Sequence, residues 1–179
     1  MGFPLAGVRS IEHGNLLDEP GAREIQKAGA YLVPTIYTSE YTLAEGEKNK
    51  QPVHAMEKAR QLHELKRKSF LKAVKGGVKI VYGTDTGIIP QGANARQFAV
   101  MVKWGMPPAQ AIRTATSMAA EMLGLSQSVG SIEAGKYADL IAVTGDPLTD
   151  ISVLEDVKFV MKSGQIIKDR PKEPVRQGH

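Results

Sequence analysis

The sequence VKIVYGTDTG, from Val78 to Gly87, joins an apolar run to a turn bounded by glycines. The run is mostly β-branched or aromatic and follows a glycine pair, which is typical of a short buried strand. Asp85 comes just after the end of this strand, where barrel and open α/β folds place their chemistry. The alternative is an Asx turn that only closes the strand, because Asp, Thr and Gly all favour turns.

Two more strands are predicted earlier in the chain. One apolar run ends in a polar cluster at His13, and a second covers residues 30–37. A helix over residues 19–27 separates them, because Asp18 is a good N-cap and Gly29 is a good helix stop.

Residues 38–52 are polar and show no clear periodicity, and a connection of this length suits either a functional lid or an ordinary surface insertion. A helix is predicted over residues 53–75, where apolar residues recur three and four apart. His54 and His63 fall on this helix, far from any strand end. Both histidines are therefore expected at the surface and not as ligands.

Two further helices are expected over residues 94–103 and 107–123, the second of which opens with a proline pair. After Gly130 the pattern changes to strands, with one strand over 137–143 and a hairpin over 157–168. These strands have no long helix between them, which indicates a separate small β unit.

The alternation of strands and helices before this unit predicts an α/β fold with parallel strands and right-handed crossovers. Three strand–helix units do not close a barrel, because an eight-stranded barrel needs about 250 residues and the chain has 179. The pattern is that of the last three-eighths of a barrel, followed by a β appendage.

Composition excludes several classes of protein. Hydrophobic residues make up 42% and charged residues 23%, which is ordinary for a globular protein, and no apolar run is long enough to cross a membrane. The absence of cysteine excludes disulfides and thiolate metal sites. The net charge of +4 is modest and no nucleic-acid-binding module is present, so no nucleic-acid partner is expected. Residues 1–5 do not resemble a signal peptide, so a cytoplasmic location is expected.

His13 and Asp85 have the same relation to their predicted strands, since each follows a carboxyl end. The carboxyl ends of barrel strands meet at one mouth, so both side chains are expected to lie close together there. Imidazole and carboxylate suit zinc or a similar divalent ion, although two ligands are too few for a complete site. A hydrogen-bonded structural histidine is the alternative for His13.

Several segments together resemble the amidohydrolase superfamily. SIEHG at 10–14 is similar to its sixth barrel strand, and VYGTDTG at 81–87 is similar to its eighth. The segment 94–116 resembles the helices that follow, and GSIEAGKYADLI at 130–141 resembles the return into a flanking β-sandwich. The resemblance extends over residues 7–168, and its closest branch is the imidazolonepropionase-like peptidases, which include Xaa-Pro dipeptidase-like enzymes and carboxypeptidases.

This resemblance implies an α/β fold in which residues 1–125 form strands six to eight of a TIM (β/α)8 barrel. Residues 126–170 would form the C-terminal strands of a small β-sandwich domain, and 171–179 a loose tail. The family's His-x-His pair, carboxylated lysine and fifth-strand histidine have no counterpart here, and Gln91 stands where its pattern has histidine. The chain is therefore interpreted as a C-terminal fragment. The alternative is a half-barrel that pairs with a second copy, which leaves a homo-oligomer open.

The resemblance also implies a function. His13 and Asp85 would bind a divalent metal, expected to be zinc with one or two ions, and Asp85 would also move protons as the catalytic residue. The expected substrate is a short peptide or other amide, and Tyr37 is a candidate substrate contact, with a packing aromatic as the alternative. A deaminase that attacks a C=N carbon and a non-catalytic remnant stay open, and the isolated chain is expected to be inactive.

Overall fold

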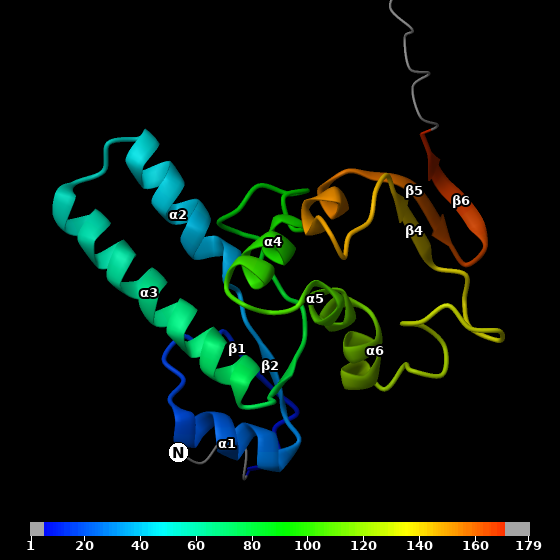
Figure 1. Cartoon of the computed structure of the whole chain (residues 1–179), viewed down its shortest axis with the longest axis horizontal. Helices are drawn as coiled ribbons and strands as arrows, with labels where there is room; N and C mark the ends of the chain where they lie inside the picture. Colours follow the sequence, from blue (N-terminus) through cyan, green and yellow to red (C-terminus); the bar gives the residue numbers. More distant parts are fainter. Residues whose placement is uncertain (1–5, 171–179) are drawn as a thin grey trace, which may run out of the picture.

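The computed structural model describes residues 6–170 and shows two separate sheets connected by helices (Figure 1). Residues 1–5 and the expected loose tail over 171–179 lie outside the described residues. The first part of the chain contains, in order, β1 (Ser10–Glu12), α1 (Glu19–Ala28), β2 (Tyr31–Val33), α2 (Tyr37–Lys48), α3 (Val53–Lys75) and β3 (Lys79–Ile80). The second part contains α4 (Arg96–Lys103), α5 (Pro108–Ala115), α6 (Ser117–Leu123), β4 (Leu140–Val143), the 3₁₀ helix η2 (Ile151–Glu155), β5 (Val157–Lys162) and β6 (Gln165–Asp169).

The first sheet is parallel and has the strand order β1-β2-β3. Its register aligns Ser10 with Tyr31 and Tyr31 with Lys79, so the three strands begin at one edge of the sheet and end at the other. This arrangement confirms the α/β class and the parallel pairing. Within residues 6–170, β1 and β3 each pair on one side only, so the sheet is open.

The middle strand β2 is buried on both faces, as is usual for a parallel sheet covered by helices. Leu32 belongs to a large core that also contains Ile80 of β3, Phe70 of α3 and residues of α1, α4 and α5. Tyr31 and Val33 face the other way and pack with Val81 against α6. The sheet therefore has one thick helical layer on one face and a single short helix on the other.

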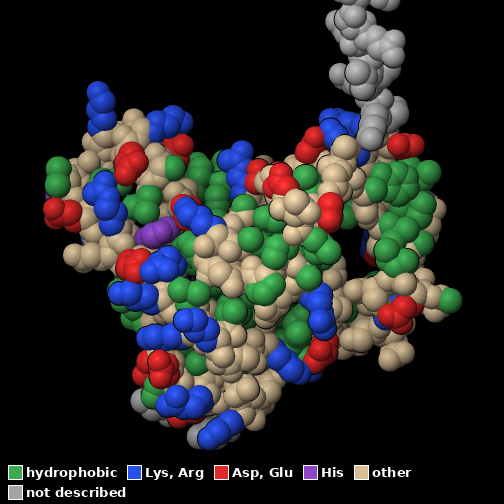
Figure 2. All heavy atoms as spheres, in the orientation of Figure 1, with side chains coloured by type: hydrophobic (Ala, Val, Ile, Leu, Met, Phe, Trp, Pro, Cys, Tyr) green, Lys and Arg blue, Asp and Glu red, His purple; other side chains and the backbone are tan. Residues whose placement is uncertain are grey.

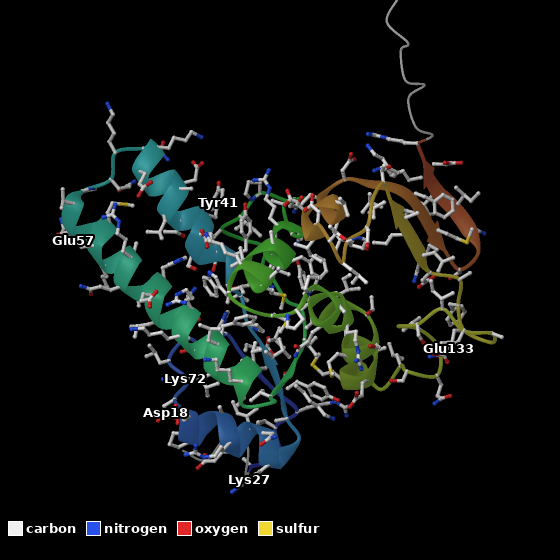
Figure 3. The ribbon with its side chains drawn as sticks, in the orientation of Figure 1. Asp18, Lys27, Tyr41, Glu57, Lys72 and Glu133 are labelled. Atoms are coloured by element: carbon white, nitrogen blue, oxygen red, sulfur yellow. The ribbon has the colours of Figure 1, made fainter. Side chains whose placement is uncertain are left out.

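Helices α1 and α3 form where local signals predict them. The Asp18 carboxylate accepts a hydrogen bond from the Gly21 N–H at 2.8 Å, and α1 ends at Gly29 with φ of +65°. Asp18 and Lys27 lie near opposite ends of α1 (Figure 3), which complements the helix dipole. The predicted bounds of α3, Val53–Lys75, are confirmed. No helix within residues 6–170 has the length and apolar character needed to cross a membrane.

The prediction that residues 38–52 lack regular structure is wrong, because most of them form α2, which packs against α3 (Figure 1). No side chain near the start of α2 caps it. Instead, the N–H groups of Ile36 and Tyr37 donate to the side-chain oxygen of Gln97 on α4, at 3.1 and 3.4 Å. The start of α2 is therefore stabilised by a residue about sixty positions further along the chain.

The single helix expected over residues 107–123 is two helices. Thr116, with φ of −123° and ψ of −98°, leaves the helical conformation between α5 and α6. The break redirects α6 so that Met118 and Met122 pack against Tyr31 and Val33 of β2. Burial of that second sheet face explains the break, which no glycine or proline marks in the sequence.

The predicted small β unit is an antiparallel sheet with the order β4-β5-β6. The hairpin turn lies at Ser163 and Gly164, both with positive φ. η2 packs against α4, where Arg96 and Glu155 form an ion pair at 3.3 Å. Hydrophobic side chains gather over this sheet in Figure 2, and three of them are well exposed, namely Ile141, Ile166 and Ile167.

Glu121 of α6 joins the amino-terminal ends of β2 and β3. Its carboxylate accepts hydrogen bonds from Lys79 at 2.6 Å and from the Tyr31 hydroxyl at 2.9 Å, and its backbone carbonyl accepts one from Arg9 at 3.1 Å. The hydrogen bonds from Lys79 and Tyr31 hold the pKa of Glu121 below its ordinary value of 4.5. Glu121 therefore stabilises the fold in its ionised form.

We expect Glu121→Gln to lower the free energy of unfolding at pH 7. Because the folded-state pKa is depressed, this contribution is complete above the unfolded-state pKa and is lost as the pH falls through the folded-state value. The difference between wild type and variant should therefore shrink below pH 4.5. Urea unfolding at several pH values measures it, with Glu57→Gln on the exposed face of α3 (Figure 3) as the control. A difference that stays constant down to acid pH would contradict the role of the carboxylate.

Candidate functional site

The loops that follow β1, β2 and β3 lie at the same edge of the parallel sheet, because all three strands run in one direction. These loops carry His13, Thr35 and Asp85 respectively. The backbone N–H of His13 donates to the Val33 carbonyl at 2.9 Å, which extends the β1–β2 pairing as far as the predicted ligand. Both predicted metal ligands thus follow strand ends at the carboxyl edge, and their role in binding a metal stays a prediction.

A threonine on the next loop orients the imidazole of His13. The ring Nδ1 lies 2.8 Å from the Thr35 hydroxyl oxygen, and the ring is exposed. The φ of His13 is +66°, a conformation uncommon for residues other than glycine, which turns the residue out of the strand direction. Because Nδ1 is engaged, Nε2 is the nitrogen left for a ligand, which is the usual arrangement of metal-binding histidines.

Asp85 lies in a loop that side-chain hydrogen bonds hold in place. The hydroxyls of its neighbours Thr84 and Thr86 lie 2.9 Å apart, and the Asn94 amide donates to them at 2.9 and 2.7 Å. The Tyr82 hydroxyl donates to the backbone carbonyl of Asn94, and burial raises the pKa of Tyr82, so it remains a donor at neutral pH. Asp85 itself has φ of +51° and is exposed, which leaves its carboxylate accessible.

Gln97 joins the loops after β2 and β3 from inside the core. Its side-chain N–H groups donate to the carbonyls of Gly83 at 2.6 Å and Pro34 at 3.2 Å. Sequence reasoning missed Gln97, Asn94 and Thr35 as residues of this edge. No local signal marks them, because their partners lie on other segments of the chain.

Tyr37, the candidate substrate contact, is the first residue of α2 and is buried. Its hydroxyl accepts a hydrogen bond from Arg96 at 3.4 Å, and its ring centroid lies 6.3 Å from that of Tyr41. These contacts agree with the packing alternative, and the substrate contact stays a prediction.

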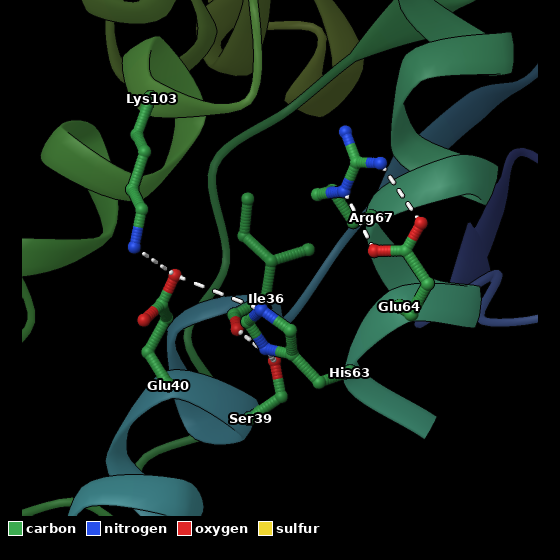
Figure 4. A network of polar contacts seen from close by, with 7 residues as sticks. All are labelled: Ile36, Ser39, Glu40, His63, Glu64, Arg67 and Lys103. Atoms are coloured by element: carbon green, nitrogen blue, oxygen red, sulfur yellow. Dashed lines mark hydrogen bonds and ion pairs between the residues drawn. The ribbon is translucent and has the colours of Figure 1, made fainter. Parts of the chain in front are cut away.

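His63 is not the surface residue that the sequence predicts. Its side chain is 18% exposed, and its ring meets Trp104 edge-on with centroids 5.3 Å apart. Nδ1 lies 3.2 Å from the Ser39 hydroxyl, and Nε2 lies 4.0 Å from Glu40, which also binds Lys103 at 2.9 Å (Figure 4). His63 therefore joins α3 to α2 and α4, whereas His54 is exposed as expected.

His13 and Asp85 both lie at the carboxyl edge and carry groups that can bind a metal ion. An oriented imidazole and an accessible carboxylate fit a divalent cation in their chemistry. Among the described residues, no three His, Asp or Glu side chains cluster so that they could hold an ion. A catalytic zinc site uses three protein ligands, so these two residues fit part of such a site.

Gly83 lets the Asp85 loop pass close to β2. A Cβ at this position would lie 2.4 Å from Cγ1 of Val33, a short and stiff side chain. We expect Gly83→Ala to lower the free energy of unfolding by about 1–3 kcal/mol through overpacking. Gly87→Ala, on the other side of Asp85 and with open space around it, should change little. Urea unfolding compares the two variants, and equal effects would contradict the close approach.

The sequence of this chain is similar to a family model and to individual proteins of known activity. The model of the amidohydrolase family matches residues 5–167. The chain is 34% identical over 169 residues to ochratoxinase from Aspergillus niger, in an alignment that covers 91% of this chain and 34% of that protein. It is 33% identical over 107 residues to imidazolonepropionase from Thermoplasma volcanium, covering 56% of this chain and 26% of that protein.

Among solved structures, a Xaa-Pro dipeptidase with bound methionine in its active site superimposes with a TM-score of 0.82 and 42% identity. That match covers 92% of this chain and 41% of the dipeptidase. The chain thus spans about a third of the length of ochratoxinase and about two fifths of the dipeptidase. Since the family match covers nearly all of the described sequence and the fold agrees with it, the chain belongs to the amidohydrolase family.

Proposed function

We propose that the polypeptide containing this chain is a metal-dependent amidohydrolase that hydrolyses amide C–N bonds in short peptides. The observation that carries the proposal is the common edge of the parallel sheet, where His13 follows β1 and Asp85 follows β3. The contact of His13 with Thr35 supports a ligand role, because it orients the ring. Relatives named as a Xaa-Pro dipeptidase and an ochratoxinase support the hydrolase class.

In this proposal β1, β2 and β3 are the sixth, seventh and eighth strands of a (β/α)8 barrel. The parallel order, and the pairing of β1 and β3 on one side only within residues 6–170, support this assignment. Strands β4 to β6 would belong to a flanking β-sandwich, and the exposed hydrophobic side chains of that sheet support a second layer over it. The barrel part would cover residues 1–125 and the sandwich part 126–170.

Residues of this chain have distinct parts in the proposed chemistry. A divalent ion, expected to be zinc, would be held in part by Nε2 of His13 and the carboxylate of Asp85, and would supply the Lewis acidity that activates water at neutral pH. When Nδ1–H of His13 donates to the Thr35 hydroxyl, Nε2 carries the lone pair and is free to bind the ion.

Asp85 is the proposed proton carrier. Its ionised carboxylate accepts a proton from the attacking water, and its protonated form then donates that proton to the leaving nitrogen as the C–N bond breaks. The amine therefore leaves as a neutral group and the carboxylate is regenerated. The positive φ of Asp85 and the anchored threonines on either side hold this carboxyl group at the strand end.

The test uses the longest polypeptide that contains this chain, called the parent polypeptide below. It is incubated with Xaa-Pro dipeptides, other dipeptides and N-acyl amino acids, and released amino acids and ammonia are measured separately. We expect release of amino acids without release of ammonia. A chelator should abolish the release of amino acids, and added zinc should restore it. Ammonia release would instead establish a deaminase. No product from any of these substrates, in protein shown to be folded and loaded with zinc, would overturn the proposal.

A further inference from the structure

Gln97, on the first turn of α4, is a fully enclosed polar side chain with 0% exposure. Its nitrogen donates to the carbonyls of Gly83 and Pro34, and its oxygen accepts from the N–H groups of Ile36 and Tyr37. Reversing the amide would place donors against N–H groups and the oxygen against carbonyls. The hydrogen-bond pattern therefore admits a single orientation, and every polar group of this side chain is used.

Gln97 is connected to His13 through the loop after β2. Thr35, whose hydroxyl lies 2.8 Å from Nδ1 of His13, stands between Pro34 and Ile36 in the sequence. Gln97 binds the backbone of both of these flanking residues. The residue that orients the imidazole is thus held from both sides by one buried amide.

Gln97 is connected to Asp85 through the loop after β3. Gly83, whose carbonyl accepts the short 2.6 Å hydrogen bond from Gln97, precedes Asp85 by two residues. Asn94, one turn before Gln97, holds Thr84 and Thr86 on either side of Asp85. Asn94 and Gln97, just before and on the first turn of α4, therefore anchor the Asp85 loop at Gly83, Thr84 and Thr86.

We infer that Gln97 is a positioning residue that sets the separation of His13 from Asp85. The two candidate ligands follow β1 and β3, which do not pair with each other within the described residues, and the loop after the middle strand β2 comes between them. Gln97 ties that loop to the loop after β3. The inference rests on the proposed function, in which both residues bind the same metal site.

The physical basis is the cost of unpaired backbone groups. Gln97→Met keeps the volume of the side chain but leaves two buried carbonyls and two N–H groups without this partner. The loops can then shift to regain hydrogen bonds, and a shift of either loop changes the separation of the ligands. Loss of residues that orient metal ligands typically weakens metal binding about 10–100-fold.

The experiment measures zinc and cobalt binding by the parent polypeptide. The Zn²⁺ dissociation constant is determined by competition with a chromophoric chelator, and the visible spectrum of the Co²⁺ form reports coordination geometry. Gln97→Met should raise the dissociation constant about 10–100-fold and change the Co²⁺ spectrum. Thr114→Val is the matched control, since Thr114 is buried on α5 and its hydroxyl donates to the Ala111 carbonyl of the same helix at 2.6 Å, with a weaker contact to Met101 of α4. It should alter neither quantity.

A conservative variant separates positioning from general destabilisation. In Gln97→Glu the buried carboxyl has a raised pKa, and in its neutral form it can still accept from Ile36 and donate to Gly83. Its ionised form would face the carbonyls of Gly83 and Pro34, which repel it. The ratio of its zinc dissociation constant to that of wild type should therefore rise as the pH increases from about 6 to 9.

The outcomes distinguish the two proposals. Wild type that binds zinc, with Gln97→Met and Thr114→Val binding it equally well, would overturn the positioning role and leave the proposed function intact. Wild type that binds no zinc at all would overturn both the metal site and the inference that rests on it.

Discussion

Replacing Asp85 by asparagine in the parent polypeptide is expected to remove nearly all amide hydrolysis. Asparagine fills the same space and can still accept a hydrogen bond, but it cannot take a proton from water and pass it to the leaving nitrogen. General acid–base catalysis contributes about 10²–10⁴-fold to rate, so kcat should fall by at least that factor. Steady-state kinetics with the best dipeptide substrate measures the loss.

The control for this substitution is Asp18→Asn, because Asp18 is an exposed carboxylate that caps α1. Asparagine caps helices about as well as aspartate does, so stability and activity should stay close to those of wild type. Hydrolysis by Asp85→Asn within a few-fold of the wild-type rate would show that Asp85 does not carry the proton.

Replacing His13 by alanine is expected to weaken zinc binding by the parent polypeptide at least about 100-fold. The reason is that mutating residues that only orient the metal ligands already lowers metal affinity by about 10–100-fold. The matched control is His54→Ala, which removes a different exposed histidine, one that lies on α3. Titration with Zn²⁺ against a chromophoric chelator gives both dissociation constants.

The substitution should have little effect on folding, since His13 is exposed and the hydrogen bond that its side chain loses is the one to Thr35. Thermal unfolding in the presence of a chelator checks this point. If zinc binds His13→Ala and wild type equally tightly, His13 is a structural histidine, the alternative that its sequence context leaves open.

Elements with strong local signals could be predicted from the sequence. α1 has an N-cap at Asp18 and a glycine in the left-handed conformation at Gly29, and α3 carries a long apolar periodicity. The hairpin β5–β6 has its turn at Ser163 and Gly164. In each case the residues that determine the element lie within it or directly beside it, so no distant contact is needed to recognise it.

Elements that depend on distant contacts were predicted wrongly. α2 was expected as an irregular segment, because its start is capped by Gln97 of α4 rather than by a local side chain. The break at Thr116 follows from the burial of α6 against β2. His63 was expected in solvent, although α2 and α4 cover it with Ser39 and Trp104.

The candidate site also combines features that have local signals with features that depend on distant contacts. The positions of His13 and Asp85 after two strands of a parallel sheet can be predicted, because the apolar runs and the turn residues next to them are local features. The residues that hold these two side chains are visible only in the folded chain, namely Thr35 for the ring and Asn94 and Gln97 for the aspartate loop. Gln97 and Pro34 are 63 positions apart, and a hydrogen bond between them exists only because the packing of α4 buries the amide beside both loops.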